Sequence, residues 1–310
     1  MKSLAVEECL KDLKVPKGND GNHYLKQIKS HIWVSKTKDD KLIIVFILRK
    51  NIAKQEYVVF GKLSYEVILN AKIVSNKTST KEDICIVSLT DDEPKKAFLY
   101  FIESLYSYKN PKRLENQNDI KNYLQEWQDL FTDHPPLSRE EQIGLWGELF
   151  FINQFSRPDK VIEKWRGPEN KTFDFVTRCE LIDIKTSNES TCHYFSLNQV
   201  SGQRPIYIFT YEIAEDSTGL NISDLIEQIN KKIHNKALFF VRLVKTRVLN
   251  TLPQRTRYIP IQQRLIKGSN IPQPRKIDKG VEKVRFKSET CNSILETSKK
   301  LASLLKNLGS

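Results

Sequence analysis

The chain has 310 residues, of which 39% are hydrophobic and 28% charged, so it can form ordinary globular cores and is long enough for two domains. No run of about 18 apolar residues occurs, and we therefore expect no membrane span. Acidic residues interrupt the N-terminal stretch MKSLAVEECLKDL, which argues against a secretory signal. The 5 cysteines are scattered without a CxxC pair, which indicates a reducing cytoplasm and neither a zinc site nor a disulfide framework.

The first part of the chain predicts a β-rich accessory domain. A short helix is expected at 3–13, followed by strand-like segments over 23–89 that are rich in β-branched and aromatic residues. The run 95–108 has helical periodicity and should pack on this sheet. The polar segment 109–118 contains a proline and is the best candidate for a linker, so we expect an N-terminal domain over 1–112.

The second part begins with two predicted helices. The first covers 119–131, and the second starts at Ser138, whose spacing to Glu141 predicts a capping box. Two glycines within the second helix, Gly144 and Gly147, lower helix propensity, and we expect them to permit close approach to a neighbouring strand.

Further along, the pattern predicts a β-hairpin followed by alternating strands and helices. Together with the helices, this order predicts an α/β (α+β) fold with a mixed-sheet core over 119–249 and a basic C-terminal extension over 250–310 that packs on the core. The predicted elements are a hairpin within 172–185, a short helix capped by Ser196, a strand at 205–213, a helix at 221–234, a strand at 237–249, an extended segment with short strands at 250–290 and a helix at 291–308.

Positive charge is concentrated in the last quarter of the chain. The formal net charge is +12, and residues 236–310 contain 17 Lys and Arg but only 4 Asp and Glu. Such a basic surface indicates a polyanionic partner, although it can also serve solubility alone. The candidates for contacts with nucleic-acid phosphates are Arg255, Arg257, Arg264, Lys267, Arg275 and Lys276.

The hairpin carries the residues on which a functional hypothesis depends. The runs TFDFV and ELIDIKT both alternate, so Asp183 and Lys185 lie on one face of the second strand. Asp174 projects away from the rings of Phe173 and Phe175, and the hairpin can bring it beside Asp183. An Asp and a Lys at this spacing can also be an ordinary solvated strand face.

Neighbouring carboxylates repel each other unless a cation lies between them. Mg²⁺ is suited to such a position because it takes oxygen ligands from one or two carboxylates, water and substrate phosphate. A metal there polarises a phosphate and lowers the pKa of a bound water. Lys185 can orient or deprotonate that water and offset the charge that develops on the phosphate. The residue types therefore predict hydrolysis of a phosphodiester.

The pattern D-x(8)-D-x-K, with a glutamate on a preceding helix, resembles the PD-(D/E)XK nuclease superfamily. The phrases GLWGEL, W-x-GP followed by DF, and IDIKT over residues 138–200 resemble a bacterial branch of unknown function that is often found among restriction and phage-defence genes. One departure is that Phe173 replaces the proline before the first aspartate. The resemblance implies a restriction-endonuclease-like fold. It also implies these site residues: metal ligands Asp174, Asp183, Glu148 and the main-chain carbonyl of Ile184, the catalytic Lys185, and Gln199 on a short helix after it.

The resulting hypothesis is a Mg²⁺-dependent DNA endonuclease of a bacterial restriction or defence system, in which Mn²⁺ can substitute. Its substrate would be duplex DNA or a displaced strand, and a homodimer or a complex with other subunits is expected because cutting both strands commonly needs two active sites. A second hypothesis is a DNA-binding or assembly subunit that keeps the fold and does not cut. A third is a nuclease that acts on RNA.

Overall fold

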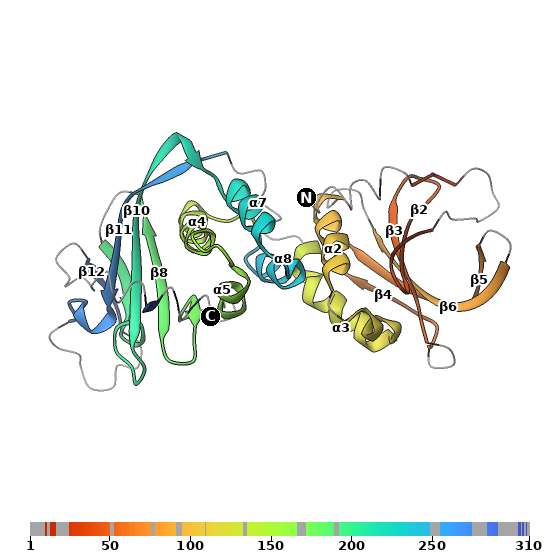
Figure 1. Ribbon diagram of the computed structural model, residues 1–310, viewed down its shortest axis with the longest axis horizontal. Helices are drawn as coiled ribbons and strands as arrows, with labels where there is room; N and C mark the ends of the chain where they lie inside the picture. The colour runs from red at the N-terminus through yellow and green to blue at the C-terminus, as the bar shows by residue number, and fades with distance from the viewer. Residues whose placement is uncertain are drawn as a thin grey trace. The chain divides into compact units, whose positions relative to one another are not determined.

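Figure 1 shows the computed structural model of the chain. The residues described are 10, 13–16, 25–49, 53–75, 78–90, 95–108, 110–132, 135–165, 172–188, 192–248, 255–274, 284–290, 303, 304, 306 and 308. Within them, no helix is both long and apolar enough to cross a membrane. The helix predicted at 3–13 and the one predicted at 291–308 lie mostly outside the described residues.

The chain forms two compact units. Unit 1 comprises residues 1–135 and 235–250, and unit 2 comprises 136–234 and 251–310. These limits differ from the predicted domain boundaries. The interval 109–118, predicted to be a linker, contains the 3-10 helix η1 (Pro111–Glu115) and belongs to unit 1. Leu114 is fully buried, and the main-chain N–H of Arg49 donates to the carbonyl of Glu115.

Unit 1 is built on a six-stranded antiparallel sheet, which confirms the predicted β-rich N-terminal region. The strand order is β1-β2-β3-β6-β5-β4, and β-branched and aromatic side chains dominate the buried positions. The strands are β1 (Lys26–Lys29), β2 (Ile32–Lys36), β3 (Leu42–Ile47), β4 (Glu56–Phe60), β5 (Leu63–Ser75) and β6 (Thr78–Leu89).

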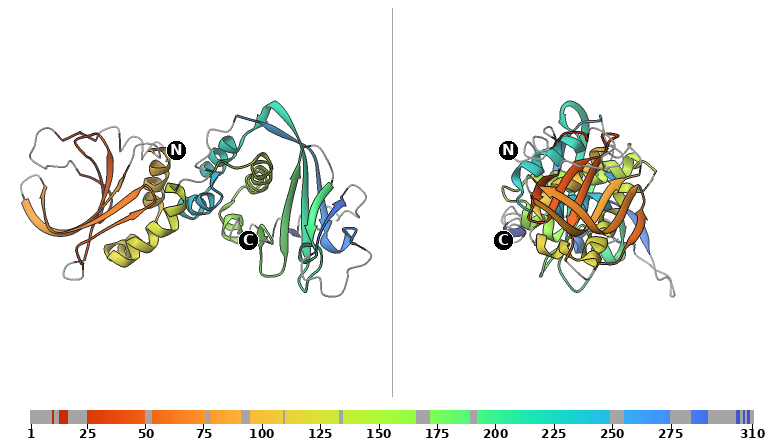
Figure 2. Two further views of the ribbon diagram at one scale, coloured as in Figure 1. Left: turned by 180° about the vertical axis from the view of Figure 1, so that it is seen from behind. Right: turned by 90° about the vertical axis from the view of Figure 1, so that its right-hand side faces the viewer.

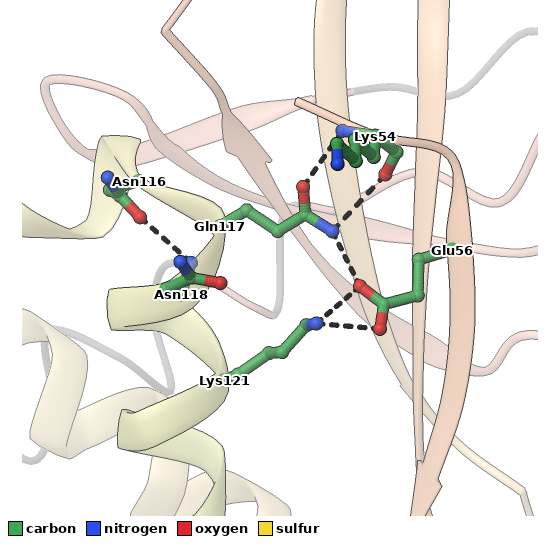
Figure 3. A network of polar contacts seen from close by, with 6 residues as sticks. All are labelled: Lys54, Glu56, Asn116, Gln117, Asn118 and Lys121. Atoms are coloured by element: carbon green, nitrogen blue, oxygen red, sulfur yellow. Dashed lines mark hydrogen bonds and ion pairs between the residues drawn. The ribbon is translucent and has the colours of Figure 1, made fainter. Parts of the chain in front are cut away.

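Helices complete the core of unit 1; the first was predicted to pack on this sheet, whereas the helix predicted at 119–131 was assigned to the second domain and instead belongs to unit 1. They are α2 (Lys95–Ser107), α3 (Gln117–Trp127), the 3-10 helix η2 (Gln128–Phe131) and α8 (Lys236–Lys245). A polar network joins α3 to the edge of the sheet (Figure 3). In it Glu56 accepts hydrogen bonds from Gln117 and Lys121, each at 2.6 Å, and Gln117 also bonds to the backbone of Lys54.

The strand predicted at 237–249 is wrong, because this segment forms helix α8. A short apolar run such as ALFFVRLV has no period that distinguishes a buried strand from a buried helix. Two tertiary contacts fix the segment in unit 1. The ring of Phe240 stacks on that of Tyr100 at 4.9 Å, and Lys236 pairs with the buried Glu103 of α2. The helix therefore belongs with the N-terminal sheet although it follows most of unit 2 in the sequence.

Unit 2 contains a mixed four-stranded sheet in the order β11-β10-β8-β7. Strands β8 and β10 are parallel, and the other pairs are antiparallel. The strands are β7 (Phe175–Val176), β8 (Leu181–Ser187), β10 (Ile206–Leu220) and β11 (Tyr258–Lys267). The last of these lies in the region predicted to be an extension. Strand β11 instead forms an edge of the core sheet, where Pro260 is tolerated.

Two different layers cover the sheet of unit 2. Helices α4 (Arg139–Asn153), α5 (Asp159–Lys164) and α7 (Ile222–Lys232) lie on one side, and a two-stranded sheet of β9 (Cys192–Ser196) and β12 (Arg285–Glu289) lies on the other (Figures 1 and 2). On the helical side, Phe151 of α4 packs against Phe175 and Phe209. The opposite core contains Phe173, Leu181, Phe195, Val200, Ile206, Ile208, Ile266 and Ile271. A mixed sheet with helices on one face fits the predicted restriction-endonuclease-like fold.

Candidate active site

The hairpin of β7 and β8 brings the two predicted aspartates to one edge of the sheet. Strand β7 has only two residues, paired as Phe175 with Ile182 and Val176 with Leu181. Asp174 therefore lies just before the strand, and not within it as the alternation of TFDFV had predicted. Its Oδ2 accepts the main-chain N–H of Ile184 at 2.6 Å. This hydrogen bond fixes the Asp174 carboxyl against β8, next to Asp183.

Asp183 is 3% exposed and contacts the predicted lysine directly. The distance from its Oδ2 to Nζ of Lys185 is 3.0 Å. Asp183 and Lys185 are two positions apart on β8. Because side chains of a strand alternate between its faces, both lie on the same face, as the sequence predicted. The ammonium group also lies 5.6 Å from the centre of the Phe195 ring on β9. Lys185 is thus held between a carboxylate and an aromatic face, with its side chain 20% exposed.

Gln199 also reaches this cluster. It lies on the short helix α6 (Leu197–Val200), and Ser196 precedes that helix as predicted. The Gln199 Oε1 accepts the main-chain N–H of Ser196 at 2.9 Å, which orients the amide. Its Nε2 then donates to Oδ2 of Asp183 at 3.2 Å and to the carbonyl of Thr172 at 3.2 Å. The amide therefore ties the Asp183 carboxyl to the segment that leads into Asp174.

Glu148 approaches from helix α4, where the predicted capping box of Ser138 and Glu141 is present. The indole Nε1 of the fully buried Trp165 donates to Oε2 of Glu148 at 2.5 Å. The sequence analysis did not predict this hydrogen bond. The bond joins side chains 17 positions apart, so no local pattern could have revealed it.

Helix α4 can approach β8 closely because Gly147 has no side chain. A Cβ at this position would lie 1.8 Å from Oγ1 of Thr186 and 3.4 Å from Cγ2 of Ile184. The prediction of close approach is therefore confirmed for Gly147. It is wrong for Gly144, where a Cβ would meet nothing within 4 Å. The residue next to the tight contact is Glu148, so the glycine sets how near that carboxyl comes to the aspartates.

The three carboxyl groups perturb one another electrostatically. Burial, followed by the charge of Asp183, raises the pKa of Glu148 to about 7, although the bond from Trp165 opposes this rise. Burial and the charges of Glu148 and Asp183 raise the pKa of Asp174 well above its ordinary value. Burial also raises the pKa of Asp183, against the opposing effects of Lys185 and Gln199. Buried acids that repel each other are stabilised by a cation between them.

The donor set suits a hard divalent cation. Carboxylate and carbonyl oxygens are available from Asp174, Asp183, Glu148 and the main chain of Ile184, and Mg²⁺ binds such oxygens while it keeps several waters. Within the described parts of the chain, no group of three or more His, Cys, Asp and Glu side chains meets the geometry of a metal centre as it stands. A site with one or two protein carboxylates, completed by water and phosphate, needs no such group.

The predicted phosphate-binding residues do not form one cluster. Arg255 and Lys267 are both exposed, but they lie near opposite ends of β11, which at ten residues is about 30 Å long. Arg257 is bound internally, with Nη2 3.0 Å from Oδ2 of Asp224 and Nη1 donating to the carbonyl of Gly219 at 2.6 Å. The candidates Arg275 and Lys276 lie outside the described residues.

Arg264 lies on the same sheet face as Lys185. In the strand registers Lys185 pairs with Thr210, and Thr210 pairs with Arg264. A shallow hollow continues along this face beyond the lysine. It is lined by Ser187, His193, Thr210, Glu212, Gln262, Arg264 and Thr290. Burial and the nearby ammonium of Lys185 lower the pKa of His193 to about 4, so this imidazole is neutral at physiological pH.

A mixed sheet that presents D-x(8)-D-x-K together with a glutamate from a packed helix defines a restriction-endonuclease-like protein of the PD-(D/E)XK class. Residues 19–290 match the model of the family described as "Putative PD-(D/E)XK family member, (DUF4420)". The match covers more than half of the chain, so the chain belongs to this family, and the resemblance of its sequence to the PD-(D/E)XK superfamily is confirmed. PD-(D/E)XK proteins are generally nucleases. No curated protein and no solved structure matches the chain significantly.

Proposed function

We propose that this protein is a Mg²⁺-dependent endonuclease that hydrolyses DNA phosphodiester bonds. The observation that carries the proposal is the ammonium of Lys185, 3.0 Å from the buried carboxylate of Asp183, whose charge raises the pKa of two neighbouring acids. A buried cluster of three perturbed acids with one lysine is unfavourable without a ligand, and such clusters occur preferentially at functional sites. Membership in the PD-(D/E)XK family supports the same chemistry.

Each side chain of the cluster has a distinct role in the proposal. Asp174 and Asp183 hold the metal, with Glu148 and the carbonyl of Ile184 completing the set. A bound Mg²⁺ or Mn²⁺ would supply polarisation of the scissile phosphate and a lowered pKa of a coordinated water. Lys185 orients the attacking water and compensates negative charge on the phosphate.

Gln199 is a positioning residue in this proposal. It is bonded to Oδ2 of Asp183, the same oxygen that faces Lys185, and thereby keeps the carboxylate directed toward its partners. Trp165 is the positioning residue for Glu148, because its indole N–H donates to one oxygen of that carboxyl. Both contacts favour the ionised form of the acids, which is the form that binds a metal.

The basic C-terminal quarter supports a nucleic-acid substrate, since a net excess of Lys and Arg attracts phosphates. We propose DNA, as duplex or displaced strand, and a place in a bacterial restriction or anti-phage system. Two copies of the chain, or one copy with another subunit of that system, would provide the two cuts that a duplex requires. Unit 1 would then serve to read the substrate or to bind the other subunit.

A cleavage assay on supercoiled and linear DNA in Mg²⁺, Mn²⁺ or EDTA tests the proposal, with an RNA of the same sequence as a further substrate. Lys185→Met should lower the rate by about 10²–10⁴-fold, the range typical of a general acid or base. Asp183→Asn should abolish metal-dependent cutting. Lys231→Met is the matched control, because it removes one positive charge from an exposed ion pair of unit 2.

Cutting that persists unchanged in both site variants would refute the assigned roles. Wild-type protein that binds DNA equally well with and without metal, and never cuts it, would instead indicate a non-cleaving subunit that retains the nuclease fold. The metal titration and the cleavage assay therefore separate an enzyme from a binding subunit.

A further inference from the structure

An exposed tyrosine marks the outer face of the β9–β12 sheet. Tyr194 is 54% exposed, whereas its neighbours His193 and Phe195 on β9 are buried. Because successive side chains of a strand alternate between faces, Tyr194 points away from the core that the other two enter. In Figure 1 β12, drawn in blue, lies on the side of the main sheet opposite α4, so this face is turned away from the helices.

Two cations lie over the ring of Tyr194. Lys287 is its direct partner in the antiparallel ladder, and Arg285 lies two residues along β12 on the same face. The Arg285 Cζ is 5.0 Å and the Lys287 Nζ 6.0 Å from the ring centre. Both cationic residues are exposed. In the part of the chain that the structure describes, no carboxylate lies within ion-pair distance of either cation.

The positive character is confined to one half of this face. Glu289 is exposed at the other end of β12, opposite Cys192, so the positive half ends before that residue. The positive half therefore consists of the ring of Tyr194 with the guanidinium of Arg285 and the ammonium of Lys287 beside it, all exposed to solvent. An exposed tyrosine by itself is ordinary. One flanked by two cations that have no ion-pair partner among the described residues has the chemistry that binds bases and phosphates together.

Strand β9 links this face to the candidate active site. The ring of Phe195, on the inner face, lies 5.6 Å from Nζ of Lys185. Tyr194 is the preceding residue on the outer face. The tyrosine and the lysine are therefore on opposite sides of the two-stranded sheet.

We propose that Tyr194, Arg285 and Lys287 form a platform that binds an unpaired stretch of nucleic acid next to the active site. A base stacks on the ring of Tyr194 or on the guanidinium plane, and the two cations bind flanking phosphates. Bases within a duplex are already stacked on their neighbours and cannot offer a free face, so the platform selects single-stranded or frayed segments. The inference rests on the proposed function, because it names the form of nucleic acid that the proposed site receives.

Fluorescence anisotropy with a short labelled oligothymidylate, and with a duplex of the same length, tests this proposal in EDTA. Tyr194→Ala should weaken binding of the single strand by about 5–150-fold, which corresponds to about 1–3 kcal/mol for one stacked base, and should leave duplex binding unchanged. Tyr194→Phe should bind like the wild type because it keeps the ring. Tyr57→Ala is the matched control, since Tyr57 is 63% exposed but belongs to unit 1.

The salt dependence separates the cations from the ring. A double variant with Arg285→Ala and Lys287→Ala should make the slope of log K against log salt shallower by about 1.4, the value for two lost phosphate contacts of a single strand. Tyr194→Ala should leave that slope unchanged, because stacking releases no counterions.

Three results would overturn the platform. They are single-strand binding of Tyr194→Ala within about twofold of the wild type, an equal loss on duplex and single strand, or no binding of single strands by the wild type at low salt. Because the assay contains no metal and requires no cutting, its outcome is independent of the catalytic roles. A protein that shows the predicted binding pattern but never cleaves DNA would retain the platform and refute the proposed nuclease activity.

Discussion

Substituting alanine for Gly147 should destabilise unit 2, whereas substituting alanine for Gly144 should stabilise it. Both residues lie inside α4, so alanine gains about 1 kcal/mol of helix propensity at either position. At Gly144 the added Cβ meets nothing within 4 Å, and the gain is realised. At Gly147 it would lie 1.8 Å from Oγ1 and 3.0 Å from Cβ of Thr186, contacts that require the helix or the strand to move.

The expected change in stability is the difference between the cost of overpacking and the gain in helix propensity. Overpacking in a well-packed interior typically costs about 1–3 kcal/mol, from which the propensity gain of about 1 kcal/mol is subtracted. We therefore expect Gly147→Ala to lower the free energy of opening by up to about 2 kcal/mol and Gly144→Ala to raise it by about 1 kcal/mol. Hydrogen exchange of peptides from α4, followed by mass spectrometry, measures this free energy in unit 2 separately from unit 1.

A double-mutant cycle identifies the responsible contact. Thr186→Ala removes the nearest atom, a buried hydroxyl that has no hydrogen-bond partner within the described residues. The combination of Gly147→Ala with Thr186→Ala should recover part of the lost stability, with a coupling of about 0.5 kcal/mol or more. Equal stabilisation by alanine at both glycines would refute the close approach of α4 to β8.

Three further predictions concern the acids of the site. In EDTA, unit 2 should lose stability as the pH rises from about 4.5 through about 7. The raised pKa of Glu148 means that the folded state keeps a proton which the unfolded chain releases, an effect of at most about 3 kcal/mol. Glu148→Gln should flatten this profile, and an unchanged slope would contradict the assignment. At about pH 8, Mg²⁺ or Mn²⁺ should raise the melting temperature of the wild type but not that of Asp174→Asn, because the variant lacks one of the two aspartates that hold the ion. Trp165→Phe removes the N–H that lowers the pKa of Glu148, so the midpoint of the stability loss should move to higher pH, whereas an unmoved midpoint would show that the hydrogen bond is unimportant.

Local patterns in the sequence predicted much of the site. Alternation in ELIDIKT was enough to place Asp183 and Lys185 on one face, because a period of two fixes side-chain direction. The predicted hairpin brought Asp174 near them, although Asp174 lies just before the first strand. The start of α4 was equally predictable, since the capping box of Ser138 and Glu141 is a short-range interaction. In each case the residues that decide the structure are close together in the chain.

Features that depend on distant partners were not predictable from the sequence. The segment that forms α8 is apolar on several sides, and tertiary contacts such as those with Tyr100 and Glu103 of α2 assign it to unit 1. Strand β11 carries Pro260, which disfavours a strand in isolation, yet its pairing with β10 along the sheet edge determines its conformation. Likewise, the platform around Tyr194 exists only because β12 returns beside β9.

Departures from local stability rules converge on the candidate site. A glycine occupies the middle of a helix, a threonine hydroxyl is buried without a partner in the described residues, and burial raises the pKa values of three acids, all around Gly147, Thr186 and Asp183. The buried acid of unit 1, Glu103, is instead neutralised by Lys236. In unit 1, therefore, the fold pairs the buried carboxylate of Glu103 with the ammonium of Lys236. At the candidate site, three acids lie close to one lysine, Lys185. Such a concentration of unfavourable features is expected where a ligand supplies the missing charge, and a divalent cation is the ligand whose chemistry matches these oxygens.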